Sequence, residues 1–114
     1  MEHRWSVRKP VDIDVRVYHG GFPGARVRAR NIGMEGMYIE TRGLALPKNS
    51  VLDVEFRLDD AGEGQNFRVP SFVRHVSGGG VGVMFRQFNQ DLFRALHNQL
   101  YTTGRLESSA RRTA

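Results

Sequence analysis

The sequence predicts an all-β protein, with about six short antiparallel strands followed by one C-terminal α-helix. Apolar and polar residues alternate in short runs, and turns rich in Gly, Pro and Asp separate these runs. This pattern is typical of antiparallel strands with one buried face. From residue 89 the apolar residues recur every three or four positions, which indicates an amphipathic helix. Regular strand spacing favours an antiparallel barrel or sandwich over a fold in which strands and helices alternate.

The first two strands are expected over residues 11–18 and 25–30. In the first, Val and Ile alternate with Asp and Arg, so one face is apolar and the other polar. The second places Arg26, Arg28 and Arg30 on one side. A solvated outer face is the simplest account of this arginine stripe.

Four further strands are expected over residues 36–41, 51–58, 66–76 and 78–85. The alternation in the second of these predicts a core face made of Leu52, Val54, Phe56 and Leu58. Pro70 cannot donate a backbone hydrogen bond, so we expect a bulge or a sheet edge there.

The helix is expected to begin after Asn89, a favourable N-cap residue, and to end near Gly104. Its apolar face is predicted to carry Leu92, Phe93, Leu96 and Leu100. The chain therefore divides into a flexible N-terminal arm at residues 1–10, a strand unit with a closing helix at 11–103, and a disordered tail at 104–114. The helix could cover one open end of a barrel.

Composition limits the classes of function. The chain has 114 residues, enough for one domain, and a formal net charge of +5 that is almost entirely due to arginine. This balance suggests an anionic partner. The absence of cysteine excludes disulfides and thiolate catalysis. No run of apolar residues is long enough to span a bilayer and no leader sequence is visible, so we expect a cytoplasmic protein without membrane insertion.

No catalytic or metal-binding constellation is visible. The four histidines lie in different expected elements without ligand spacing, and the chain contains no nucleophile elbow, phosphate-binding loop or dinucleotide fingerprint. We therefore expect a protein that is not an enzyme and holds neither metal nor cofactor.

A binding site is easier to recognise. Arg4 and Arg8 stand four residues apart just before Pro10, which disfavours helix at the preceding residue. In an extended chain four residues span about 13 Å. Two guanidinium groups at this spacing can contact separate points of one dianionic ligand of nucleotide size.

A second motif, Asn-Ile-Gly-Met-Glu-Gly, follows the second expected strand at residues 31–36. With the preceding Arg-x-x-x-Arg segment, the sequence resembles the PilZ domain family, bacterial receptors for cyclic di-GMP. The family signature is R-x-x-x-R followed by [D/N]-x-S-x-x-G, and the resemblance extends over about residues 3–101. It implies a six-stranded antiparallel β-barrel with a C-terminal α-helix.

The resemblance also implies the ligand-binding residues. Arg4 and Arg8 would hold the guanines and phosphates of cyclic di-GMP, and Asn31 would face a guanine edge. Gly36 would keep the turn open, so that the ligand can approach the backbone. Gly33 replaces the motif serine, and the loss of one neutral hydrogen bond would weaken binding about 2- to 12-fold.

His3 stands where many members that bind two stacked ligands have a further arginine, which favours one ligand here. The resemblance implies a receptor whose N-terminal arm changes conformation on binding, with Trp5 as part of the surface then presented to an unidentified protein effector. The first alternative is a degenerate adaptor that does not bind cyclic di-GMP. The second is a basic barrel that binds nucleic acid through the arginine stripe, which we do not expect because no aromatic residues are interleaved there.

Overall fold

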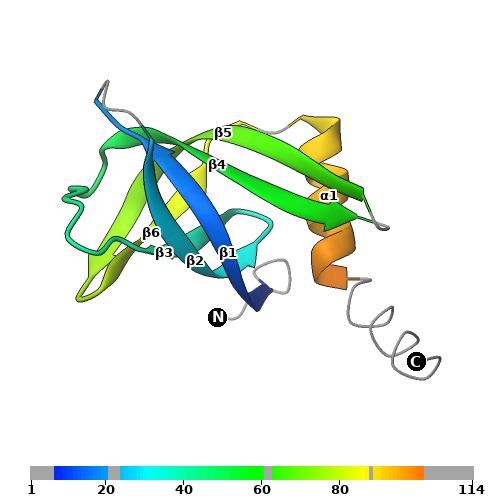
Figure 1. Ribbon diagram of the computed structural model, residues 1–114, viewed down its shortest axis with the longest axis horizontal. Helices are drawn as coiled ribbons and strands as arrows, with labels where there is room; N and C mark the ends of the chain where they lie inside the picture. The colour runs from blue at the N-terminus through cyan, green and yellow to red at the C-terminus, as the bar shows by residue number, and fades with distance from the viewer. Residues whose placement is uncertain (1–6, 21–23, 61–62, 88, 102–114) are drawn as a thin grey trace.

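The computed structural model describes residues 7–20, 24–60, 63–87 and 89–101. The strands are β1 (Arg8–Tyr18), β2 (Ala25–Gly33), β3 (Gly36–Glu40), β4 (Val51–Asp60), β5 (Glu63–Ser77) and β6 (Gly80–Phe85), and the helix is α1 (Gln90–Tyr101). The strands form a closed antiparallel barrel in the order β1-β2-β3-β6-β5-β4, and α1 lies at one end of it (Figure 1). The predicted all-β class, the antiparallel barrel and the terminal helix are confirmed.

The predicted alternation fills the barrel interior. Val15 and Val17 of β1 are buried, while Val11 and Ile13 pack against the core from partly buried positions. On β4 the whole predicted core face is buried, namely Leu52, Val54, Phe56 and Leu58. Burial of these side chains supplies the main driving force for closing the sheet.

The helix begins as predicted but turns a different face to the core. Asn89 Oδ1 accepts a hydrogen bond from the backbone N–H of Leu92 at 2.7 Å, which confirms the N-cap. Leu92, Ala95 and Leu96 are buried, and α1 packs against β4. The prediction that Phe93 faces the core is wrong, because its side chain is 53% exposed. Phe93 lies about 100° around the helix axis from Leu92, whereas Ala95 lies on the same buried face as Leu92. The expected stop at Gly104 lies outside the described residues.

Two strand boundaries differ from the prediction in a way that shapes the site. β1 begins at Arg8 rather than at residue 11, so the expected arm contributes its last three residues to the barrel. β2 continues to Gly33, so the expected loop at residues 31–36 shortens to the two-residue turn Met34–Glu35. The remaining arm residues 1–6 and the expected tail at 104–114 lie outside the described residues.

No bulge lies at Pro70. The β4–β5 register runs unbroken through its pair with Asp53, and the irregularity of β5 lies between Val73 and His75 on the β6 side. The carbonyl oxygen of Pro70 accepts a hydrogen bond from Arg86 N at 2.7 Å, so the proline nitrogen also faces the β6 side. Pro70 lies just past the end of the hydrogen-bonded pairing between β5 and β6, so the N–H that proline lacks would not have paired with β6.

Candidate functional site

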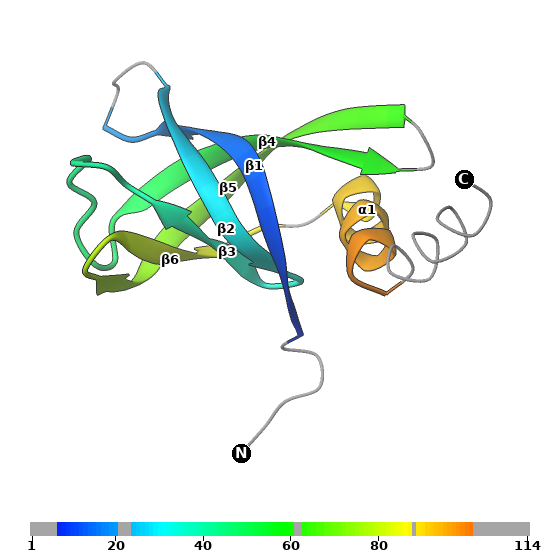
Figure 2. The same cartoon turned by 60° about the horizontal axis from the view of Figure 1, so that its bottom comes forward.

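The two motifs meet where the start of β1 passes alongside the end of β2 (Figure 2). Arg8 pairs with Gly33 in the strand register. Its guanidinium Nη1 donates hydrogen bonds to Asn31 Oδ1 at 2.9 Å and to the carbonyl oxygen of Gly36 at 3.4 Å. Of the residues predicted to bind ligand, four therefore gather at this junction, namely Arg8, Asn31, Gly33 and Gly36. Arg4 lies outside the described residues, as do His3 and Trp5.

The two motif glycines have structural reasons of their own. Gly36 pairs with Met84 of β6, and a Cβ added to Gly36 would overlap the carbonyl oxygen of Val83. Glycine is thus required for the close approach of β3 to β6, in addition to any role toward a ligand. A Cβ added to Gly33 would lie 2.8 Å from the carbonyl oxygen of Val7. Glycine in place of the motif serine therefore leaves room for the chain at the start of β1, which passes close to this position.

A pocket of about 260 Å³ opens beside the contact between Arg8 and Asn31. It is lined by Arg8, Glu35, Arg74, His75, Gly82, Val83 and Met84, and we call it the arginine pocket. Its volume is just below the ~300–1,000 Å³ typical of small-molecule sites. A base with its phosphate fits this volume better than a whole dinucleotide does, so a larger ligand would extend over the surface beside it.

Arg74 is the residue of this pocket that the sequence analysis missed. It stands on an outward position of β5, and its Nη1 lies 3.4 Å from the sulfur of Met84 as a weak hydrogen bond. No motif includes it. The glycine-rich turn that precedes residues 80–85 indicates a β5–β6 hairpin, which would have placed Arg74 beside β6. Its nearness to Arg8 depends on β6 also pairing with β3, which alternation along the chain does not encode.

Two of the three arginines of the stripe on β2 are neutralised within the protein. Arg28 forms ion pairs with Asp12 and Asp14, and Arg30 with Asp12 and Glu40. The hydrogen bond from Arg28, with weaker attraction from Arg28 and Arg30, lowers the pKa of Asp12. A nucleic-acid backbone would have to displace these carboxylates, which weakens that alternative.

The arginines of the pocket differ from Arg28 and Arg30 of the stripe. Among the described residues, neither Arg8 nor Arg74 has a carboxylate within ion-pair distance. Their hydrogen-bond partners are neutral. Two arginines that line one pocket without a described carboxylate partner favour an anionic ligand, and each can bind phosphate or the O6/N7 edge of guanine through two parallel bonds.

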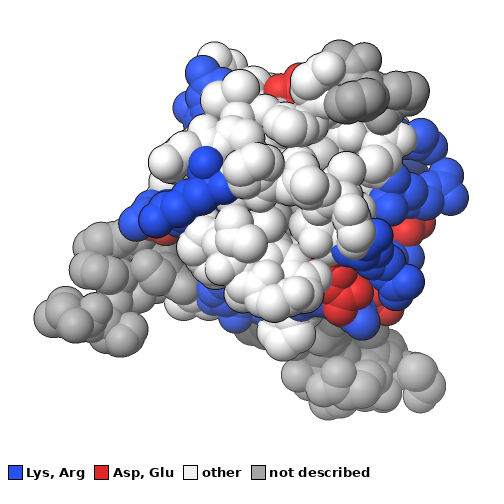
Figure 3. All heavy atoms as spheres, turned by 90° about the vertical axis from the view of Figure 1, so that its left-hand side faces the viewer, with Lys and Arg blue, Asp and Glu red and all other residues white. Residues whose placement is uncertain are grey.

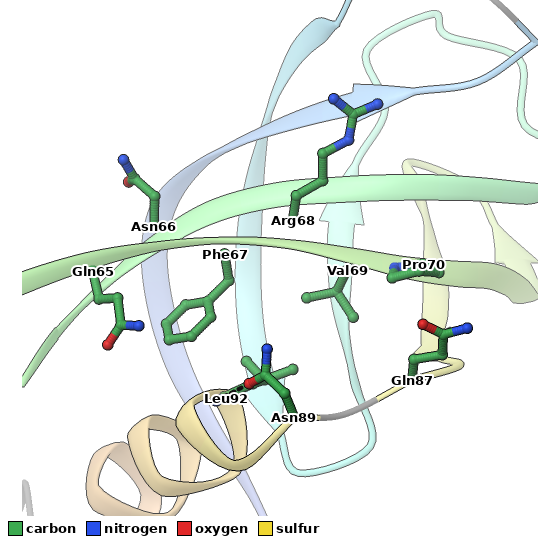
Figure 4. Close-up of a pocket in the computed structure, with 9 residues that line it drawn as sticks. All are labelled: Gln65, Asn66, Phe67, Arg68, Val69, Pro70, Gln87, Asn89 and Leu92. Carbon is green, nitrogen blue, oxygen red and sulfur yellow. Dashed lines mark hydrogen bonds between the residues drawn. The ribbon is translucent and has the colours of Figure 1, made fainter.

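A second pocket, of about 250 Å³, lies between β5 and the start of α1 (Figure 4). Its polar lining consists of four amide side chains and Arg68, and Asn89 is occupied in capping the helix. Arg68 points away from this pocket (Figure 4) and lies over the Tyr18 ring, 3.7 Å from its centroid, with an ion pair to Asp53 at 3.0 Å. No other cation of the described residues lines it, so it suits an anionic ligand less well.

The described residues contain neither a metal-binding cluster nor a membrane-spanning helix. No three His, Asp or Glu side chains among them lie close enough together to hold a metal ion. Within the same part of the chain, α1 is too short and too polar to cross a bilayer.

The model of the PilZ domain matches residues 2–102. The chain belongs to the PilZ domain family. PilZ domains are binding and adaptor domains rather than enzymes, and the family is one of cyclic di-GMP receptors. No curated protein matches this PilZ domain in sequence.

Solved structures share the PilZ fold. The Bacillus subtilis inhibitor of motility, MotI/DgrA, superimposes with a TM-score of 0.78 at 18% identity, over 97% of this chain and 54% of the other. The chain thus spans about half the length of that protein. The PilZ domain of CeSA from a cellulose-synthesizing bacterium gives 0.65 at 17% identity, over 84% and 96%. An uncharacterized Legionella protein gives 0.53 at 11% identity, over 92% and 98%.

Proposed function

We propose that this PilZ domain binds cyclic di-GMP at the arginine pocket and relays binding to a protein partner through its N-terminal residues. The observation that carries the proposal is the 2.9 Å hydrogen bond from Arg8 to Asn31, which joins the two family motifs across 23 residues of sequence. It fixes in place an arginine that lines the pocket and has no carboxylate partner among the described residues.

Both residues of this hydrogen bond retain donor groups that can bind a ligand. Arg8 uses Nη1 for its two contacts, which leaves the other guanidinium donors for phosphate or guanine. Asn31 uses its oxygen, so its amide N–H groups can face a base or a phosphate oxygen. In the proposal Arg4 joins from the segment that precedes β1, and this segment changes conformation around one bound ligand.

A protein partner is part of the proposal because a binding domain without catalysis must pass its signal on. The barrel end formed by the loop between β3 and β4 and by the β5–β6 hairpin carries a broad surface with few charges (Figure 3). Val51 and Val76, which flank these segments, are 59% and 54% exposed. Exposed apolar surface of this kind suits contact with a protein.

Calorimetric titration with cyclic di-GMP tests the binding step. We expect saturable binding of one ligand per chain and a loss of about tenfold or more in affinity for Arg8→Ala, the value of one bidentate guanine contact. Arg57→Ala is the matched control, because Arg57 pairs with Asp59 on β4 away from the arginine pocket. GTP serves as the control ligand.

Absence of binding by the folded wild-type protein would overturn the receptor proposal. The remaining function would then be that of an adaptor without ligand, for which the missing hydroxyl at Gly33 is the supporting observation. Hydrogen exchange tests the relay separately. We expect the residues that precede β1 to gain protection on ligand binding, and unchanged exchange in a ligand-saturated protein would contradict the relay alone.

A further inference from the structure

Glu35 introduces a negative charge into the arginine pocket. It is the single acidic residue among the described residues that line this pocket. It lies in the short turn between β2 and β3 and is half-buried. Its carbonyl oxygen accepts a hydrogen bond from Phe85 N at 2.8 Å. The backbone that carries this carboxylate is therefore fixed against the end of β6.

Glu35 differs from every other carboxylate whose side chain the structure describes. The others contact an arginine or, in one case, the Tyr18 hydroxyl, and they are Asp12, Asp14, Glu40, Asp53, Glu55, Asp59 and Asp91. The Glu35 carboxylate has neither an ion pair nor a hydrogen bond within the described residues, although two arginines line the same pocket. Within the described structure this carboxylate is therefore available to accept hydrogen bonds from a ligand in the pocket.

The combination of separate arginines and a carboxylate selects the chemistry of that ligand. A site for phosphate alone would be weakened by a negative charge at its wall. A carboxylate is an acceptor of hydrogen bonds and needs a group with N–H donors. Guanine carries the acceptors O6 and N7 on one edge, and the donors N1–H and N2–H₂ on the adjacent edge. One guanine can thus satisfy both an arginine and a carboxylate.

We propose that Glu35 is a specificity-determining residue that accepts hydrogen bonds from N1–H and N2–H₂ of one guanine of the ligand, while an arginine of the pocket holds the O6/N7 edge or the phosphate. This inference rests on the proposed cyclic di-GMP function. Adenine presents an unprotonated N1 toward such a carboxylate, so the site rejects it by repulsion between acceptors. Hypoxanthine keeps O6, N7 and N1–H but lacks the N2 amino group, so it loses one of the two bonds.

The test compares cyclic di-GMP with its inosine analogue in calorimetric titrations of the wild-type protein and of Glu35→Gln. We expect the wild type to favour the guanine ligand by about tenfold or more, the value of a hydrogen bond to a charged group. Glu35→Gln should bind cyclic di-GMP about tenfold more weakly and lose most of this preference. Asp59→Asn is the matched control, because Asp59 is exposed and lies outside the arginine pocket.

The direction of the change in affinity distinguishes recognition of guanine by Glu35 from a general effect of its negative charge. Removing a negative charge near an anionic ligand strengthens binding by Coulomb attraction alone, whereas losing a guanine acceptor weakens it. Tighter cyclic di-GMP binding by Glu35→Gln, or an undiminished preference for guanine, would overturn this inference and leave the receptor function standing. Failure of the wild type to bind cyclic di-GMP would overturn both, so the two failures are separable.

Discussion

Lys9 Nζ donates a hydrogen bond to the carbonyl oxygen of Gln99, 3.2 Å away, and joins the start of β1 to the last turn of α1. Neighbouring residues of a strand point to opposite sides, so Arg8 reaches the arginine pocket while Lys9 reaches the helix. The last turn of α1 has no basic residue of its own, and Lys9 supplies the cation that its exposed carbonyls favour. A shift of the start of β1 therefore acts on α1 as well.

Lys9→Ala tests this link. Loss of the bond should lower the free energy of unfolding by about 0.5–1.5 kcal/mol and speed amide exchange in the last turn of α1, because an end carbonyl loses its partner. Urea unfolding and hydrogen exchange measure the two effects. Lys48→Ala is the control, since Lys48 is exposed in the loop between β3 and β4. Equal results for the two variants would show that the contact contributes nothing.

Gly33→Ser restores the motif serine, yet we expect it to destabilise the protein. Its Cβ would lie 2.8 Å from the carbonyl oxygen of Val7, and such overpacking costs about 1–3 kcal/mol. Thermal unfolding should show a lower midpoint, and titration should show no gain in affinity for cyclic di-GMP. Gly78→Ser is the control, because a Cβ there meets no atom within 4 Å. A stable Gly33→Ser variant with tighter binding would contradict the expectation.

Arg74→Ala should weaken cyclic di-GMP binding by about tenfold while leaving thermal stability unchanged. Its guanidinium contact in the described structure is a weak bond to the Met84 sulfur, so little folding energy depends on it. Arg26→Ala is a suitable comparison, because Arg26 is an exposed arginine of β2 that does not line the arginine pocket. Equal affinities of the two variants would remove Arg74 from the site.

Acid should weaken the contribution of Asp12 to stability. The hydrogen bond from Arg28 lowers the pKa of this carboxyl from its ordinary 3.8, so its stabilising effect is present above that value and is lost as the pH falls through the lower folded pKa. Asp12→Asn should therefore be less stable than the wild type near pH ~7, and the gap should close toward pH ~2. Urea unfolding across this range measures the gap. Because the pair is exposed, ~1 M salt should shrink the gap as well.

The fold could be predicted because the core of each strand follows local alternation. The buried row of β4 illustrates this, since its apolar residues occupy every second position. Phe93 could not be placed correctly, because spacing alone allows several apolar stripes on one helix and packing against β4 selects among them. The expectation of a bulge or an edge at Pro70 stayed open for a similar reason, since only the end of the β5–β6 ladder shows that Pro70 lies where no pairing is interrupted, as at an edge.

The candidate site was predictable in part. Arg8 and Asn31 carry a recognisable spacing, and the structure brings them into contact. Arg74 lies in no motif and Glu35 occupies a position that the second motif leaves unspecified, and their shared pocket arises from the pairing of β6 with both β3 and β5. The reason for Gly36 also lies partly across the barrel, at the carbonyl oxygen of Val83. Side chains assembled by distant strand pairing are thus the part that one sequence leaves open.

Closure of the barrel has a consequence for how a partner can bind. Each of the six strands has a neighbour on both sides, but β1 and β4 pair with each other only over Val15–Tyr18 and Asp53–Phe56. The register thus leaves the first part of β1 and the end of β4 without a strand partner at this seam, and β5 pairs with β6 only from Ser71 onward. Closure therefore confines strand addition to these stretches. Elsewhere a partner must recognise side chains, on the sparsely charged barrel end or on the outer face of α1, where Phe93, His97 and Tyr101 form a continuous row of rings.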